Sequence, residues 1–195
     1  MFRLNKLRIT KCKILLMLFL CCFSCKKEKE YNEVKKILEE VLVDDQKFRD
    51  PIYEHIKQDS LDRKNIKIVT KIIDSLGWLG ENEVGKDANL ALFVTIQHAH
   101  DVETMEKYLP IMKMAVKNGN AKKRQLAYLI DRVELLNNRK QIYGTQLSFK
   151  NNGRAYVENL IDSIHLNSRR EKMELDPIDD YLKIVDSSNN IIVKK

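Results

Sequence analysis

The sequence predicts a mainly α-helical fold: a single domain of about five to seven helices that ends in a small C-terminal antiparallel β-hairpin. Apolar residues recur at helical spacing in five stretches, at about 31–49, 60–76, 88–101, 102–117 and 122–137. Beyond them the pattern changes to strand-like segments, Gln141 to Phe149 and Arg154 to Val157, on either side of the turn sequence Asn151-Asn152-Gly153. The chain is long enough to bury a core without a disulfide.

The first 24 residues resemble a secretory signal of the bacterial lipoprotein type. A basic segment without acids precedes the apolar run Ile14 to Phe23, which is too short to span a bilayer as a permanent helix. Ser24 is a small residue before Cys25, so we expect Cys25 to be acylated, with Cys21 or Cys22 as alternative acceptors. An uncleaved anchor is the other interpretation. Both place the protein in the cell envelope, attached to a membrane on the periplasmic or cell-surface side.

The remaining domain boundaries and the net charge of the mature chain follow from ending the signal at Ser24. Residues 25–30 read as a charged tether, 31–185 as the helical domain and 186–195 as a polar tail. Five of the 35 Lys and Arg lie in the signal, which leaves 30 against 28 Asp and Glu. A net charge of about +2 gives no electrostatic case for nucleic acid as a partner. All four cysteines lie in residues 1–25, so the domain has no thiolate for catalysis or metal binding.

Each predicted helix has a start or stop signal. Asp50-Pro51 breaks the chain after the first helix and Gly77 ends the second. The third, which is apolar almost all round from Leu90 to Ala99, predicts a buried core helix. Asp101 is the expected N-cap of the fourth helix, which Pro110 should kink. Shorter helical segments are expected at about 167–173 and 176–182.

Four of these helices carry polar side chains on faces that should be buried. They are Asp45 and Arg49 in the first helix, Asp62 and Asn65 in the second, Gln97 and His98 in the third, and Asp131 and Arg132 in the fifth. An unpaired buried charge costs several kcal/mol, so these groups must pair with each other, with water or with a ligand. They form either a structural network that fixes helix packing or the wall of a binding pocket.

Recognisable catalytic motifs are absent. The sequence has no nucleophile elbow, no phosphate-binding glycine loop, no dinucleotide fingerprint and no HExxH. His98 and His100 superficially match a metal-binding pattern, but residues two apart on a helix face different ways. We therefore expect neither a metal site nor a cofactor.

Several dispersed motifs, taken together, resemble a known family. They are Asp45-Gln46 with Arg49, Asp62 with Asn65, Gly77-Trp78, Val84-Gly85-Lys86, Gln97-His98-Ala99, Ala127-Tyr128-Leu129 with Asp131-Arg132, Gln141-x-Tyr143-Gly144-Thr145-Gln146, Asn167 with Arg169-Arg170, and Tyr181-Leu182. From about Lys36 to Leu182 the chain resembles the bacterial family known as domain of unknown function 6624. Leu79 and His100 depart from residues common in that family. The resemblance implies a set of site residues and no reaction.

The leading hypothesis is a lipid-anchored domain with a polar pocket that binds, or binds and hydrolyses, a small polar or anionic ligand. Asp45, His98 and Asp131 are its acid–base candidates, and Arg49, Arg132 or Arg169 would hold an anionic group. The other candidate ligand-binding residues are Gln46, Asp62, Asn65, Gln97, Gln141, Tyr143, Thr145 and Gln146. The alternative is a membrane-tethered interaction domain in which the polar residues are scaffold and exposed faces, such as Glu103 to Lys117, bind an unidentified protein.

Overall fold

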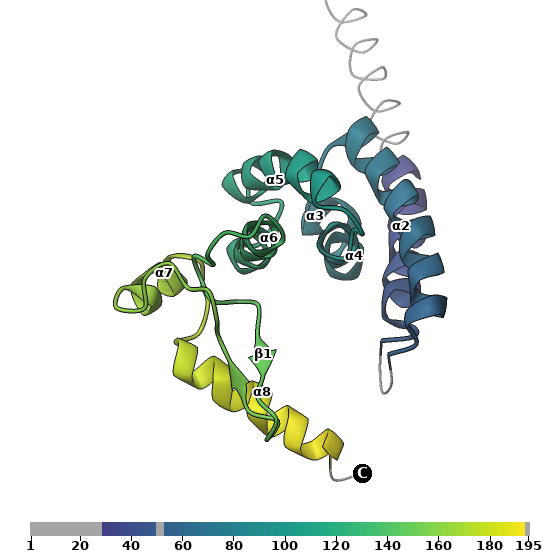
Figure 1. The fold of residues 1–195 in the computed structure, drawn as a ribbon. Helices are drawn as coiled ribbons and strands as arrows, with labels where there is room; N and C mark the ends of the chain where they lie inside the picture. The colour runs from purple at the N-terminus through teal and green to yellow at the C-terminus, as the bar shows by residue number, and fades with distance from the viewer. Residues whose placement is uncertain (1–28, 50–52, 194–195) are drawn as a thin grey trace, which may run out of the picture.

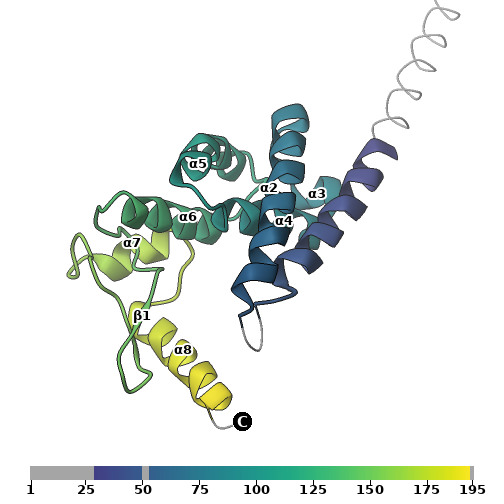
Figure 2. The same cartoon turned by 45° about the vertical axis from the view of Figure 1, so that its right-hand side comes forward.

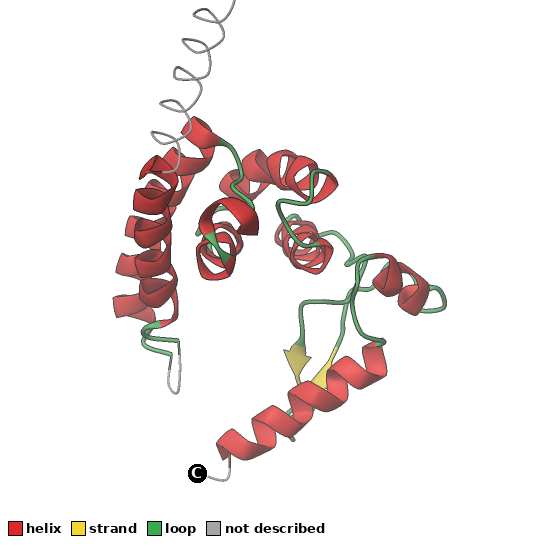
Figure 3. Ribbon diagram, turned by 180° about the vertical axis from the view of Figure 1, so that it is seen from behind, coloured by secondary structure: helices red, strands yellow, loops and turns green. Residues whose placement is uncertain are grey.

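The computed structural model describes residues 29–49 and 53–193, with side chains to residue 187. The predicted fold class is confirmed: the described chain is mainly helical, with one two-stranded antiparallel sheet near its C-terminus (Figure 3). Among the described residues, no helix has both the length and the apolar composition that crossing a membrane requires. The expectations about the signal segment and Cys25 concern residues outside this range.

The first helix, described over residues 29–46, lies beside α2 (His55–Leu76) at one side of the molecule (Figures 1 and 2). Leu38 and Val69 are buried in the hydrophobic core between these helices and the rest of the domain. The first helix ends earlier than predicted and α2 begins earlier. The backbone N–H of Phe48 donates to the side chain of Gln58 at 3.0 Å, which ties the turn after the first helix to the start of α2.

The centre of the domain is α4 (Lys86–Gln97), which packs against α2, α5 and α6. Ala88, Leu92 and Ile96 have no exposed surface, as predicted for a core helix. The helix ends at Gln97, with His98 as its C-cap, because the backbone then turns toward the N-cap of α5. The short helix α3 (Glu81–Val84) lies between the second and third predicted helices, where the sequence predicted no helix or strand.

Helices α5 (Val102–Lys117) and α6 (Lys123–Leu136) pack on each other, and both contact α4. The predicted N-cap is confirmed, since the Thr104 N–H donates to the Asp101 carboxylate at 2.7 Å. Pro110 lies inside α5, which continues through it to Lys117.

The C-terminal part lies on the other side of α6 (Figure 1). Strand β1 (Ser148–Phe149) pairs antiparallel with β2 (Ala155–Tyr156), a shorter hairpin than predicted. Next come α7 (Leu166–Lys172) and α8 (Ile178–Val193). Helix α8 continues well past its predicted end, so most of the predicted polar tail is helical. It is tied to the hairpin where the Ala155 N–H donates to the Asp186 carboxylate at 2.8 Å.

Candidate functional site

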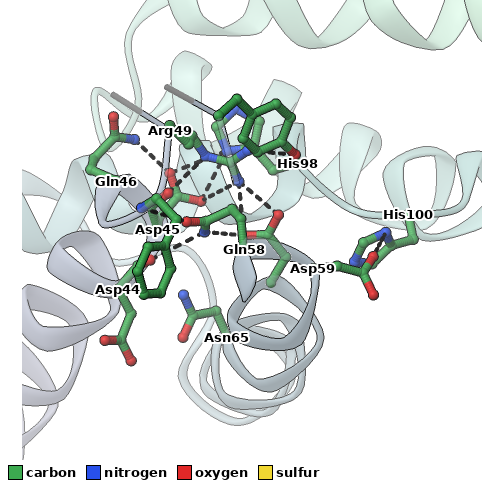
Figure 4. Close-up of polar contacts among 12 residues, drawn as sticks. Asp44, Asp45, Gln46, Arg49, Gln58, Asp59, Asn65, His98 and His100 are labelled. Carbon is green, nitrogen blue, oxygen red and sulfur yellow. Dashed lines mark hydrogen bonds and ion pairs between the residues drawn. The ribbon is translucent and has the colours of Figure 1, made fainter. Parts of the chain in front are cut away.

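A polar network joins the end of the first helix to α2 and α4. We call it the Asp45 network; it consists of Asp45, Arg49, Gln58, Asp62 and His98 (Figure 4). Asp45 is 1% exposed although it sits on a helix face that is otherwise apolar. The prediction that Asp45 points into the protein is therefore confirmed, whereas Arg49 lies in the turn after the helix and is only partly buried.

Arg49 holds the two carboxylates of this network together. Its Nη2 lies 2.8 Å from both oxygens of Asp62 and 3.5 Å from Asp45 Oδ1. Its Nε donates to the backbone carbonyl of Asp45 at 2.7 Å. Burial would lower the pKa of Arg49, but the opposite charges and hydrogen bonds of Asp45 and Asp62 outweigh it and raise the pKa above its usual value, so the guanidinium stays charged.

Gln58 completes the network from α2, and the sequence prediction missed it. Its side chain has no exposed surface, and its Nε2 donates to Asp62 Oδ1 at 2.8 Å and to the Asp44 carbonyl at 3.2 Å. The sequence signal was present, because Gln58 precedes Asp62 by one helical turn. It was overlooked because the helix was expected to start at Ser60. Gln46, a predicted site residue, is exposed, and its Nε2 lies 2.6 Å from Asp45 Oδ2.

His98 adds a titratable ring from the end of α4. Its Nδ1 lies 2.9 Å from Asp45 Oδ1. Burial would raise the pKa of Asp45, but the hydrogen bond and charge of His98, followed by Arg49, lower it below its usual value. An ionised carboxylate only accepts, so Nδ1 must carry the proton and the Nε2 of the neutral ring keeps a lone pair. His98 is a quarter exposed, and no described residue bonds to Nε2.

Arg132 on α6 lies beside this network without joining it. No hydrogen bond or ion pair links it to any residue that the structure describes, and its Nε is buried without a partner. Burial and then the positive charge of Arg49 lower the pKa of Arg132, and Tyr53 opposes them. The Tyr53 hydroxyl in turn accepts from Arg49 Nη1 at 3.4 Å. Two guanidiniums thus lie near Tyr53, and of these only Arg49 is paired with carboxylates of the described residues.

Two further predicted residues are buried near these helix faces but do not bond to the network. Asn65 Nδ2 donates to the Val41 carbonyl at 3.3 Å, while its Oδ1 has no partner. Gln97 is 6% exposed, and its Oε1 is buried and unpartnered. Both therefore keep an unused acceptor inside the domain.

Asp131, although adjacent to Arg132 in sequence, belongs to a second cluster. It has no exposed surface, and its carboxylate accepts from the backbone N–H groups of Ile142 (2.7 Å), Tyr143 (3.0 Å) and Thr145 (2.9 Å). The Thr145 hydroxyl donates to the same carboxylate at 2.9 Å. The donors converge because Gly144 between them adopts φ +64°. Asp131 therefore fixes the loop 141–146 to α6.

The remaining predicted residues hold that same loop. Gln141 is fully buried and bonds the backbone at Gln146 in both directions, at 3.0 Å each. Arg169 Nε donates to the Ile142 carbonyl at 2.7 Å, and its guanidinium also bonds Asp162. Arg170, which the sequence prediction did not single out as a site residue, is 1% exposed and donates to the Tyr143 carbonyl at 2.8 Å. Gln141, Arg169 and Arg170 thus bind backbone atoms of the loop and do not bond to one another.

The predicted site residues thus fall into two groups. The structure brings Asp45, Arg49, Asp62 and His98 together, with Arg132 beside them. The second group lines the loop 141–146, where nearly all of its polar atoms bind backbone. Tyr143 is half-buried there, and burial, followed by the charge of Asp131, raises its pKa. Only the first group leaves a charged donor and a ring nitrogen unused.

The two histidines near the end of α4 serve different partners. His100 Nδ1 lies 3.2 Å from Asp59, whereas His98 bonds Asp45, and Figure 4 shows the two pairs well apart. Within the described ranges, no group of three or more His, Cys, Asp or Glu side chains is placed to hold a metal ion.

These features define a mainly helical domain with a buried acid–base network at the end of its first helix. Residues 33–194 match a family described as one of unknown function (DUF6624), and the chain belongs to that family. No match was found among curated proteins or among solved structures.

Proposed function

We propose that this domain binds a small anion between Arg132 and Arg49. The observation that carries the proposal is the guanidinium of Arg132, whose Nε is buried and unpartnered. Among the described residues, the positive charge that acts on it belongs to another arginine, Arg49, and this repulsion disfavours the charged form of Arg132. Arg132 is only partly exposed, and charges largely removed from water are normally paired, so an anionic ligand would supply the missing partner.

The unused donors favour an anion with several oxygens. A guanidinium offers five N–H groups, and none of those of Arg132 has a partner within the described chain. The Tyr53 hydroxyl accepts from Arg49 and keeps its own proton for a ligand. A phosphate or sulfate group has enough acceptor sites for this set, whereas a single carboxylate fills fewer of them.

His98 gives the same site a proton acceptor. With Nδ1 held by Asp45, Nε2 is the atom that can take a proton from a water molecule. That water would attack the phosphorus of a bound phosphate ester, forming a new P–O bond as the ester P–O bond breaks. The proton on Nε2 would then pass to the leaving oxygen. Water is the only co-reactant, and Asp45 orients the ring and stabilises its charged form.

The proposal includes attachment to a membrane of the cell envelope. Its support is the basic and apolar sequence before Ser24-Cys25, together with the charged tether that follows. A domain held in this way would meet its ligand outside the cytoplasm.

A thermal-shift series tests anion binding. Inorganic phosphate, sulfate, acetate and citrate are added to the protein and to its Arg132→Met variant. Arg154→Met is the matched control, because Arg154 is exposed and has no ion pair with a described residue. We expect phosphate or sulfate to raise the Tm of the protein and the control, and to leave Arg132→Met unchanged. Equal shifts in all three would contradict the proposal.

The absence of any shift would favour the other function that the sequence allows, a membrane-tethered interaction domain. The polar residues would then serve only to fix helix packing.

A further inference from the structure

A groove lies between the first helix and α2, on a part of the surface that the Asp45 network does not use. We call it the apolar groove; its volume is about 530 Å³. Its apolar lining is Ile37, Ile68, Ile72 and Leu76, and Lys67 and Lys71 line it as well. Ile37 is 42% exposed.

The groove exists because α2 carries two apolar stripes. Val69 and Ile73 are buried in the core. Ile68, Ile72 and Leu76, each one turn apart, form a second stripe that is only partly covered. A helix with a second apolar face is expected to pack against a second partner.

The charges at the groove indicate what that partner carries. Lys67 and Lys71 are one turn apart, so their like charges repel along the helix. Neither lysine forms an ion pair with a described residue, in contrast to Lys64 one turn earlier, which pairs with Asp44 at 2.9 Å. An apolar slot with unpaired lysines suits a molecule that has a hydrocarbon part and an anionic group.

The position of the groove favours a lipid as that molecule. Glu30, near the start of the first helix, contributes to the groove lining. Cys25 precedes Glu30 by five residues, which span at most about 18 Å when fully extended. A chain acylated at Cys25 would therefore keep the groove close to the bilayer surface and at high effective concentration there.

We propose that the apolar groove docks the domain on the bilayer by taking part of the acyl region of an anionic phospholipid, with the lipid phosphate at Lys67 and Lys71. A second copy of the chain and a protein partner fit less well. A stable protein interface buries about 800 Å² on each side, whereas only four apolar side chains of the described residues line this groove. The inference rests on the membrane attachment included in the proposed function.

Docking at this end would hold the candidate anion site away from the membrane. Asp45 follows Glu30 by fifteen residues of the same helix, or about 22 Å. Arg132 and His98 would then face the aqueous phase while only the C-terminal half of α2, which lines the groove, lies against the lipid surface.

The test uses the full-length protein reconstituted into vesicles. One vesicle type is phosphatidylethanolamine with phosphatidylglycerol, the second is phosphatidylcholine alone, and detergent micelles are the reference. A water-soluble acylating reagent modifies exposed lysines, and mass spectrometry measures the extent at each. Lys113 and Lys117, which have the same spacing on α5 and are exposed, are the internal control.

We expect Lys67 and Lys71 to react several-fold more slowly in the anionic vesicles than in the other two, while Lys113 and Lys117 react equally in all three. The double variant Ile68→Asp, Ile72→Asp, which keeps both lysines, should lose this protection. Unprotected lysines on a chain that floats with the vesicles would overturn the docking and leave the anchoring intact. Failure to float would overturn both. Protection in micelles that grows with protein concentration would show a second copy in the groove and also overturn the inference.

Discussion

Arg132 and Arg49 act on each other through their positive charges, yet only Arg49 is bonded to carboxylates. Arg49 reaches Asp45 and Asp62 because all three lie where the first helix meets α2. Arg132 approaches from α6, a helix that brings no acid to this place, since its neighbour Asp131 turns to the loop 141–146. The result is a fixed cation that has no counter-charge among the described residues.

Replacing Asp131 by asparagine should strongly destabilise the protein. The change removes the charge that three backbone N–H groups and the Thr145 hydroxyl share, and it turns an amide donor toward them. We expect a loss of about 3–5 kcal/mol in the free energy of unfolding, measured by urea denaturation. Glu171→Gln, an exposed change on α7, should stay within about 0.5 kcal/mol. A mild effect of Asp131→Asn would show that the loop does not depend on this carboxylate.

Gly144→Ala should destabilise the same loop through the backbone. Gly144 has φ +64°, and an added Cβ would lie 3.2 Å from Val157 Cγ1. Gly153 in the hairpin turn has φ +78° and nothing within 4 Å of an added Cβ. Both alanines bear the strain of positive φ, about 1 kcal/mol, and only Gly144→Ala adds the contact. Urea unfolding should therefore rank Gly144→Ala as the more damaging change, and the reverse order would contradict this assignment.

The Asp45 network should make stability depend on acidity. Burial opposes the charge of Asp45, but His98 and Arg49 prevail and lower its pKa from the ordinary value of 3.8. A carboxylate with a lowered folded-state pKa stabilises the protein above its unfolded pKa, and this is lost as pH falls through the folded value. The difference in unfolding free energy between the protein and Asp45→Asn should hold from pH 6 to about 4 and shrink below 3.8. A constant difference down to pH 2 would refute the shift.

The tautomer of His98 is a separate prediction. Because Asp45 accepts from Nδ1 at 2.9 Å, the neutral ring should carry its proton there and leave Nε2 bare. Long-range proton–nitrogen NMR spectra of the ring distinguish the two tautomers at a pH where it is neutral. His165, whose Nδ1 lies 2.7 Å from the exposed Asp162, is an internal comparison. A proton on Nε2 of His98 would remove it as a proton acceptor for the site.

The sequence predicted the helical fold and several of the buried polar residues, because both follow from the 3.6-residue period. Asp45, Arg49, Asp62 and Asp131 were identified as polar residues on apolar faces, and all lie in the interior or at its edge. The hydrogen-bond partners of these side chains could not be predicted from the sequence. Periodicity shows that Asp131 faces inward. It does not show that Asp131 binds the loop 141–146, or that Arg132 lies within reach of the charge of Arg49.

The lengths of the C-terminal elements were also out of reach of the sequence. Strand-like alternation favoured a long hairpin, whereas the buried Gln141 and Arg170 hold the first half of that segment as an irregular loop. Helix α8 extends past its predicted end, and the hydrogen bond from the Ala155 N–H to Asp186 ties this extension to the hairpin.

Diffraction from crystals soaked in phosphate tests the anion site most directly, with Arg132→Met crystals as the reference. The account predicts a tetrahedral anion within hydrogen-bond distance of Arg132 Nε, close to Arg49 and the Tyr53 hydroxyl, and no such density in the variant. Arg132 paired with a carboxylate of the protein itself, with no anion beside it, would contradict it.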